Sequence, residues 1–143
     1  MNLERAIEIA VEAHKGVVDK GGNPYVLHPL RMMFAVSNEE EKIVAVLHDV
    51  IEDSIDWEFE RLEKEGFSAA VIDALRSVTK ITEDEDYDAF IERAMTNTIG
   101  RRVKIADLRD NLDVTRIGEL AEKDMKRINK YKKALARLTG TRN

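Results

Sequence analysis

Four ionisable residues lie close together in a segment that is otherwise apolar. His48 and Asp49 follow the run Val44–Leu47, and Glu52 and Asp53 come soon after. Buried ionisable groups are rare unless they are paired or bind a metal. On a helix, His48 would share a face with Glu52, and Asp49 with Asp53. The pattern predicts a polar strip facing a cavity, although a single such pair is more often an exposed helix surface.

Two further candidates lie far from this segment in the sequence. His28 precedes Pro29 at the expected start of a helix, and Asp107 lies among apolar residues. Each of them, taken alone, is more often structural. Two imidazoles and two carboxylates together suit Mn²⁺, Fe²⁺ or Zn²⁺ better than an all-oxygen Ca²⁺ site. The spacing does not establish that His28 and Asp107 converge with His48 and Asp49.

The elements that would position these residues are helices. Apolar residues recur at helical spacing in the segments 3–14, 30–36, 39–51, 57–66, 69–78, 87–95, 99–113 and 121–138. Ser37 or Asn38, and also Asp56 and Ser68, are expected to cap helices, and segment 39–51 is apolar nearly all round, which predicts a central buried helix. No segment predicts a strand. We expect an all-α fold, a single domain over residues 1–143 built as a bundle of about seven to eight helices.

The composition excludes several classes of protein. The 143 residues contain no Cys, which excludes a disulfide scaffold and a thiol nucleophile and is compatible with the cytoplasm. No apolar run approaches the roughly 18 residues of a membrane span, and the acidic start does not predict a signal peptide. A net charge of −5 argues against nucleic acid as a partner. We expect a small-molecule substrate and no membrane; the sequence does not predict the oligomeric state.

Five short motifs occur in an order that resembles a known family of enzymes. They are Ala13-His14-x-Gly16, Gly22-Asn23-Pro24-Tyr25-x-x-His28-Pro29, Leu47-His48-Asp49-Val50-x-Glu52-Asp53, Val78-Thr79-Lys80 and Val103-Lys104-x-Ala106-Asp107-x-x-x-Asn111. This order is similar to that of the hydrolase domain of the RelA/SpoT family and of the small alarmone hydrolases. These are metal-dependent phosphohydrolases of the HD type.

The resemblance implies an activity and a set of site residues. It implies that four residues bind one Mn²⁺ ion, or Fe²⁺ or Zn²⁺ in its place: His28, His48, Asp49 and Asp107. It further implies that Glu52 and Asp53 position or deprotonate the attacking water. The family reaction removes pyrophosphate from the 3′ position of guanosine tetraphosphate (ppGpp) or pentaphosphate and leaves GDP or GTP.

The expected contacts with the nucleotide depart in part from the family pattern. Lys20 and Asn111 carry over as substrate-binding candidates, and Lys104 could face a substrate phosphate one helical turn before Asp107. Asp19 stands where the family commonly has Arg, and Val114 stands where it has Thr. These changes keep open a phosphatase or pyrophosphohydrolase of another nucleotide.

Two functions of other classes also remain open. One is a catalytically silent module that binds a nucleotide, against which the intact pair Glu52 and Asp53 argues. The other is an interaction protein that uses its Lys-rich last helix on an acidic partner. For that helix, a charged amphipathic face is a sufficient explanation. We expect a structural role for His14 and a solvated loop for the acidic residues 83–86.

Overall fold

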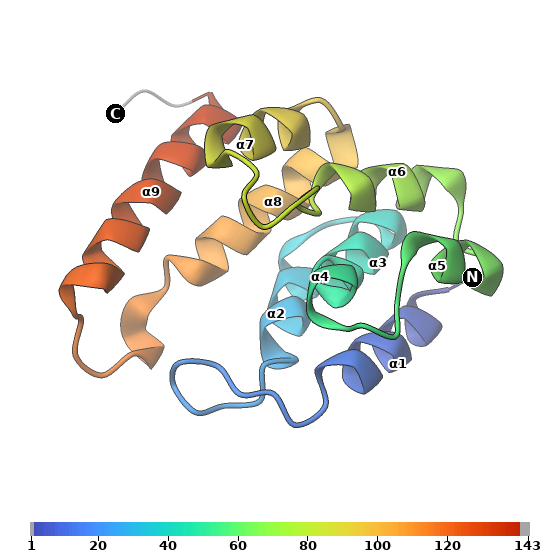
Figure 1. Ribbon diagram of the computed structural model, residues 1–143, viewed down its shortest axis with the longest axis horizontal. Coiled ribbons are helices and arrows are strands. Elements are labelled where there is room, and N and C mark those ends of the chain that lie inside the picture. The colour runs from blue at the N-terminus through green and yellow to red at the C-terminus, as the bar shows by residue number, and fades with distance from the viewer. Residues whose placement is uncertain (1, 141–143) are drawn as a thin grey trace.

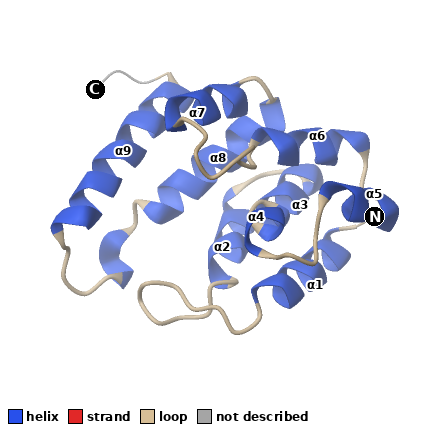
Figure 2. Cartoon of the chain, in the orientation of Figure 1, coloured by secondary structure: helices blue, strands red, loops and turns tan. Residues whose placement is uncertain are grey.

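Regular structure in the computed structural model consists of helices (Figures 1 and 2), and the model describes residues 2–140. The elements are α1 (Leu3–His14), α2 (Leu27–Ala35), α3 (Glu39–Leu47), α4 (Val50–Asp53), α5 (Phe59–Glu65), α6 (Ala69–Ser77), α7 (Tyr87–Met95), α8 (Thr98–Asn111), the 3-10 helix η1 (Val114–Arg116) and α9 (Glu122–Thr139). Across residues 2–140 there is no β-strand, and an isolated bridge joins Val18 to Pro24. The predicted all-α fold is confirmed. No helix in this range is long and apolar enough to cross a membrane.

Capping side chains fix where several helices begin. Asn2, Asn38, Ser68, Asp86 and Asn97 each accept a hydrogen bond from a backbone N–H in the first turn of the following helix. Such caps are typically worth about 1 kcal/mol. Of the two caps expected before α3, Ser37 and Asn38, the structure has Asn38, and the cap expected at Ser68 is confirmed. The cap expected at Asp56 is wrong, because Trp57 is buried in the core and α5 starts only at Phe59.

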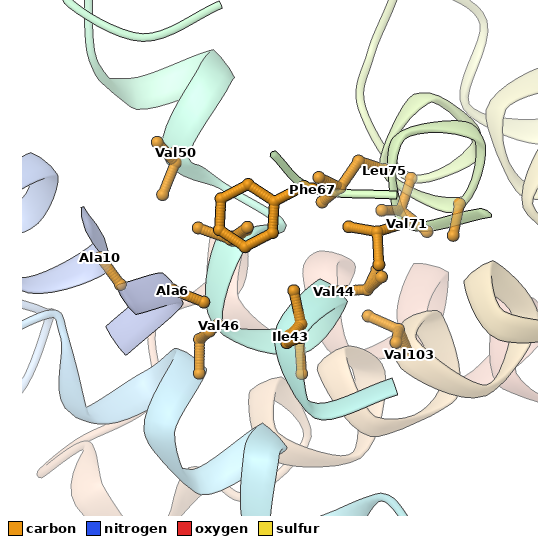
Figure 3. Packing of buried hydrophobic residues seen from close by; sticks show 14 of the residues in the cluster. Ala6, Ala10, Ile43, Val44, Val46, Val50, Phe67, Val71, Leu75 and Val103 are labelled. Atoms are coloured by element: carbon orange, nitrogen blue, oxygen red, sulfur yellow. The ribbon is translucent and has the colours of Figure 1, made fainter. Parts of the chain in front are cut away.

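The central helix of the larger hydrophobic cluster is α3. It packs against α1, α2, α6 and α8, and all residues of 43–47 are buried. Figure 3 shows Val44 of α3 close to Val71 of α6 and Val103 of α8. Burial of each Val or Leu side chain contributes about 1.5–3 kcal/mol. The end of α3 is therefore firmly held, and the candidate site begins there.

The continuous helix predicted over residues 39–51 is interrupted at His48 and Asp49. α3 ends just before His48, and α4 begins just after Asp49. Nδ1 of His48 lies 2.7 Å from the carbonyl oxygen of Ala45. In an uninterrupted α-helix that carbonyl accepts from the N–H four residues later. The His48 side chain competes for the carbonyl oxygen of Ala45, and the backbone forms a turn between α3 and α4.

A second, smaller cluster joins the last three α-helices. It contains Ile91, Leu108, Ala134 and Leu138. α9 packs against both α7 and α8, and Figure 1 shows it alongside α8. The amphipathic character predicted for the last helix is confirmed, although Met125 near its start is 47% exposed. α8 contributes to both clusters, and Asp107 lies on it between them.

α8 and α6 approach each other closely at Gly100. A Cβ atom at this position would lie 2.0 Å from Oγ of Ser77 and 3.2 Å from its Cβ. Ser77 is buried, and its hydroxyl donates to the carbonyl of Ala74 at 2.6 Å. As long as Ser77 lies opposite, position 100 therefore requires glycine, and this contact sets how near α8 lies to α6.

Candidate metal centre

Two buried histidines face each other at the centre of the site. His28 lies in the first turn of α2 and His48 at the end of α3, and their ring centroids are 5.3 Å apart. Each ring is held through Nδ1. In His28 this atom is 2.7 Å from Oδ2 of Asp110, and in His48 it is 2.7 Å from the oxygen of Ala45. Both rings therefore turn Nε2 toward the candidate centre.

Two carboxylates complete the predicted ligand set. Oδ2 of Asp49 is 3.0 Å from Nε2 of His48, and the ligand atoms of His28, His48 and Asp49 all lie within 4.8 Å of one another. Asp107 stands outside this compact triad. Its Oδ1 is nevertheless 3.1 Å from Nε2 of His28 and 3.7 Å from Nε2 of His48. The structure thus brings together all four residues from three separate segments.

The donor atoms fit a divalent cation. Nε2 of His48 is buried and has no hydrogen-bond partner among the described residues, yet a carboxylate oxygen of Asp49 lies 3.0 Å away. A neutral imidazole lone pair and a carboxylate repel each other unless a proton or a cation lies between them. Burial lowers the pKa of His48, but Asp49 and Asp107 raise it well above its ordinary value. The field that attracts a proton here also attracts a metal ion.

Asp107 stays ionised in spite of its burial. Burial raises the pKa of this carboxyl, but Lys104, His28 and His48 bring it well below its usual range. Nζ of Lys104 is 2.7 Å from Oδ2 of Asp107, and Nδ2 of Asn111 donates to Oδ1 at 2.9 Å. Two of the predicted substrate contacts, Lys104 and Asn111, therefore hold a predicted ligand in place.

The two predicted catalytic carboxylates lie on α4. Oε1 of Glu52 accepts a hydrogen bond from the backbone N–H of Lys80 at 2.5 Å, and Glu52 lines the cavity at the metal centre. Asp53 is not among the residues that line that cavity. Asp53 is exposed at the surface, but partial desolvation, followed by the charges of Asp49 and Glu52, raises its pKa to about 6.

Sequence reasoning gave no role to Tyr25 at this centre. Its hydroxyl donates to Oδ2 of Asp49. Its ring lies 5.0 Å from that of His14 and 5.7 Å from that of His28. Burial and the charge of Asp49 raise the pKa of Tyr25, so the hydroxyl keeps its proton and acts as a donor. The signal in the sequence was its place in the motif that ends at His28.

Two cavities adjoin at the site. The smaller, of about 180 Å³, contains His48, Asp49 and Glu52 in its wall, and the larger has a volume of about 510 Å³. Four residues line both of them: Tyr25, His28, Asn111 and Tyr131. The larger cavity also has four cationic side chains in its wall: Lys20, Arg31, Arg116 and Arg127. Three carboxylates line it as well, Asp19, Asp110 and Asp113, so an anionic ligand that extends from the metal centre into this cavity would meet one more cation than acids.

The loop between α1 and α2 forms one wall of the larger cavity. Oδ1 of Asp19 accepts hydrogen bonds from the backbone N–H groups of Gly21 and Asn23, both at 2.9 Å. Nζ of Lys20 points toward Asp124 of α9, 3.8 Å from its Oδ1. Asp19 thus shapes its own loop, which gives a structural reason for an acid at this position.

Known proteins share part of this sequence. No family model matches the chain. A guanosine-3′,5′-bis(diphosphate) 3′-pyrophosphohydrolase of Aquifex aeolicus is 32% identical over 119 residues, 78% of this chain and 17% of that protein. A protein of the same name from Borreliella burgdorferi is 30% identical over 143 residues, 90% of this chain and 21% of that protein. The chain resembles the RelA/SpoT hydrolases.

The similarity concerns one segment of much longer proteins. A putative chloroplastic GTP diphosphokinase of Arabidopsis thaliana is 33% identical over 85 residues, which is 57% of this chain and 10% of that protein. The chain spans only 10 to 21% of the length of these three relatives. Their names include both a pyrophosphohydrolase and a diphosphokinase, so the names alone do not assign an activity to this chain.

Proposed function

We propose that this chain is a metal-dependent phosphohydrolase of the HD type that removes pyrophosphate from the 3′ position of guanosine tetraphosphate or pentaphosphate. One observation carries the proposal: His28, His48, Asp49 and Asp107 converge around the unpartnered Nε2 of His48. The names of the Aquifex and Borreliella relatives support the same substrate. The cytoplasmic location stays a prediction.

Mn²⁺ is the proposed ion, with Fe²⁺ and Zn²⁺ as alternatives, because the donor set mixes imidazole nitrogen and carboxylate oxygen. Such an ion, when bound, polarises a phosphoryl oxygen and lowers the pKa of water. His28 and His48 would hold it through Nε2, and Asp49 and Asp107 through their carboxylates. The hydroxyl of Tyr25 orients Asp49 for this purpose, and Lys104 orients Asp107.

We assign the proton transfer to Glu52 and Asp53. A general base works best when its pKa lies near the operating pH. Partial desolvation raises the pKa of Glu52, and partial desolvation with the charge of Asp49 raises that of Asp53 to about 6. Both changes favour a carboxylate that can accept a proton from water and release it again. Glu52 is the stronger candidate because it lines the cavity.

The substrate would occupy both cavities. The larger cavity, of about 510 Å³, lies within the usual range of roughly 300–1,000 Å³ for small-molecule sites. We propose that Lys104 and Asn111 contact the 3′-phosphates next to the metal. Lys20 and the arginines of the larger cavity would then face the remainder of the nucleotide.

A hydrolase for another nucleotide is the second candidate, and Asp19 favours it. Both hydrogen bonds of its Oδ1 stay within its own loop, so this position offers the nucleotide no cation. A silent nucleotide-binding module is the third candidate. Turnover of guanosine tetraphosphate distinguishes the proposed function from these two candidates.

The deciding experiment measures the release of phosphate and pyrophosphate with Mn²⁺ present. The substrates are guanosine tetraphosphate, its adenosine analogue, NADPH and ordinary nucleoside monophosphates. We expect pyrophosphate from guanosine tetraphosphate. Turnover of another nucleotide alone would keep the metal-dependent reaction and reassign the substrate. If the protein binds Mn²⁺ but turns over none of them, the binding module is correct and the proposed activity is wrong.

A further inference from the structure

We infer that Asp110 is a positioning residue of the metal centre, which fixes the ring of His28 so that its Nε2 faces the ion. This inference rests on the proposed metal site but concerns a residue outside the ligand set. Asp110 lies on α8, one turn after Asp107, and His28 lies on α2. The contact between them joins residues 82 positions apart in the chain.

The first step of the argument is the hydrogen bond to the ring. Oδ2 of Asp110 is 2.7 Å from Nδ1 of His28, and the two side chains are 12% and 6% exposed. Arg31 pairs with both oxygens of the same side chain, the bidentate arrangement that an ionised carboxylate makes. An ionised carboxylate can only accept. Nδ1 of His28 is therefore the donor, which leaves Nε2 for a metal.

The second step is that Asp110 is itself fixed. Nε and Nη2 of Arg31 donate to Oδ1 and Oδ2 of Asp110 at 2.7 and 2.9 Å. This bidentate pairing sets the plane of the carboxylate as well as its position. Nη2 of Arg116 donates to the backbone carbonyl of Asp110 at 2.9 Å. The carboxylate is therefore not free to rotate away from His28.

The third step separates this role from that of an ordinary ion pair. Arg31 lies one turn after His28 on α2, so an Asp110–Arg31 pair alone would suffice to join α8 to α2. The additional bond to Nδ1 places negative charge behind the metal-facing imidazole. Such a carboxylate orients the ring and increases the basicity of its other nitrogen, and its loss typically weakens metal affinity by about 10- to 100-fold.

Three variants test the inference, with Mn²⁺ alone as the probe in isothermal titration calorimetry. Asp110→Ala removes the acceptor, and we expect the Kd for Mn²⁺ to rise by about 10- to 100-fold. Asp110→Asn keeps an acceptor oxygen but no charge, and its Kd should lie between those of wild type and Asp110→Ala. Asp113→Ala is the matched control. It removes a carboxylate that also pairs with Arg116 but does not contact His28, and its Kd should equal that of wild type.

A second readout reports on the ring itself. In ¹⁵N-labelled protein loaded with Zn²⁺, the Nδ1–H of His28 should give a downfield, slowly exchanging resonance in wild type and in Asp113→Ala. The resonance should be lost in Asp110→Ala and shifted upfield in Asp110→Asn, because a neutral oxygen is a weaker acceptor. A role limited to joining α2 and α8 would not predict this signature.

The outcomes distinguish the inference from the proposed function. Unchanged Mn²⁺ affinity together with an unchanged resonance in a folded Asp110→Ala variant would overturn the positioning role. If the absence of cooperative unfolding shows that Asp110→Ala is not folded, Asp110→Asn is used instead. A wild-type Kd for Mn²⁺ and an unshifted resonance in Asp110→Asn would then overturn the positioning role. Failure of the wild-type protein to bind Mn²⁺ or Zn²⁺ would instead contradict the proposed metal centre.

Discussion

Oε1 of Glu52 accepts a hydrogen bond from the backbone N–H of Lys80 at 2.5 Å and so ties α4 to the loop that precedes α7. Glu52→Gln keeps an oxygen for this bond but cannot take a proton. We therefore expect normal Mn²⁺ content and turnover reduced by roughly 10²-fold or more, the scale of a lost general base. Steady-state kinetics with metal analysis checks this. Glu60→Gln, on the exposed surface of α5, is the control, and undiminished turnover would remove Glu52 from the mechanism.

Asp49 is the ligand candidate whose removal should be most informative. Asp49→Ala leaves Nε2 of His48 without its nearby carboxylate and Tyr25 without its acceptor. We expect the variant to lose both Mn²⁺ and activity while it retains its helical circular dichroism spectrum. Elemental analysis after dialysis measures the metal, with the exposed Asp56→Ala as the control. Full metal content in Asp49→Ala would show that the ligand set is wrong.

Tyr25→Phe tests the donor to Asp49. The change deletes one hydroxyl and keeps the ring that lies against His14 and His28. A residue that orients a ligand typically contributes about 10-fold or more to metal affinity, so we expect the Kd for Mn²⁺ to rise by that factor. Calorimetric titration provides the measurement. Equal affinities of the variant and wild type would limit Tyr25 to packing.

Metal binding should stabilise the fold, because the four candidate ligands come from three separate segments. At a free Mn²⁺ concentration of about 100 times the Kd, mass action adds about 2.7 kcal/mol to the free energy of unfolding. For a chain of this size we expect Tm to rise by roughly 5–10 °C. Differential scanning calorimetry with and without chelator tests this. The same rise in Asp49→Ala would place the ion elsewhere.

The loop that carries Lys80 should respond to acid through Glu85. Oε1 of Glu85 accepts from Nη2 of Arg93 at 2.7 Å and from the backbone N–H of Ile81 at 2.9 Å. The hydrogen bond from Arg93 lowers the pKa of Glu85 below its ordinary value of 4.5. The pKa of Glu85 is lower in the folded state than in the unfolded state. The ionised Glu85 therefore stabilises the fold above pH 4.5, and this contribution is lost as the pH falls through the lowered pKa.

Glu85→Gln makes this dependence measurable. Wild type should unfold at a higher denaturant concentration than the variant at pH 6, and the difference should shrink as the pH is lowered below 4.5. Urea titrations followed by circular dichroism at pH 6 and at a series of pH values below 4.5 provide the comparison. A difference that stays constant with pH would mean that the charge of Glu85 does not contribute to stability.

Local signals in the sequence predicted the helices well. The segment expected over residues 87–95 matches α7, the cap at Ser68 is the one expected, and Asn38 is one of the two caps expected before α3. These features depend on neighbouring residues, so a single sequence contains the information. The break after α3 was not predicted, because the pattern of apolar residues around His48 is that of a continuous helix. Only the bond from its ring to Ala45 reveals the turn.

Contacts between distant segments account for what the sequence did not show at the site. The pairing of Asp110 with His28 and Arg31 joins α8 to α2 across about 80 positions, and no spacing rule reaches that far. Asp110 is not among the site residues that the sequence predicts. The four candidate ligands were found by their residue types and by the order of their motifs, whereas their convergence required the fold.

The close approach of α8 to α6 at Gly100 has an evolutionary consequence. Asp107 lies seven residues further along α8, about 10 Å away and on the same face of the helix. A larger side chain at position 100 would meet the hydroxyl of Ser77 and displace the helix on which Asp107 is carried. In an alignment of homologues we therefore expect positions 77 and 100 to covary, with alanine at 100 accompanied by glycine or alanine at 77.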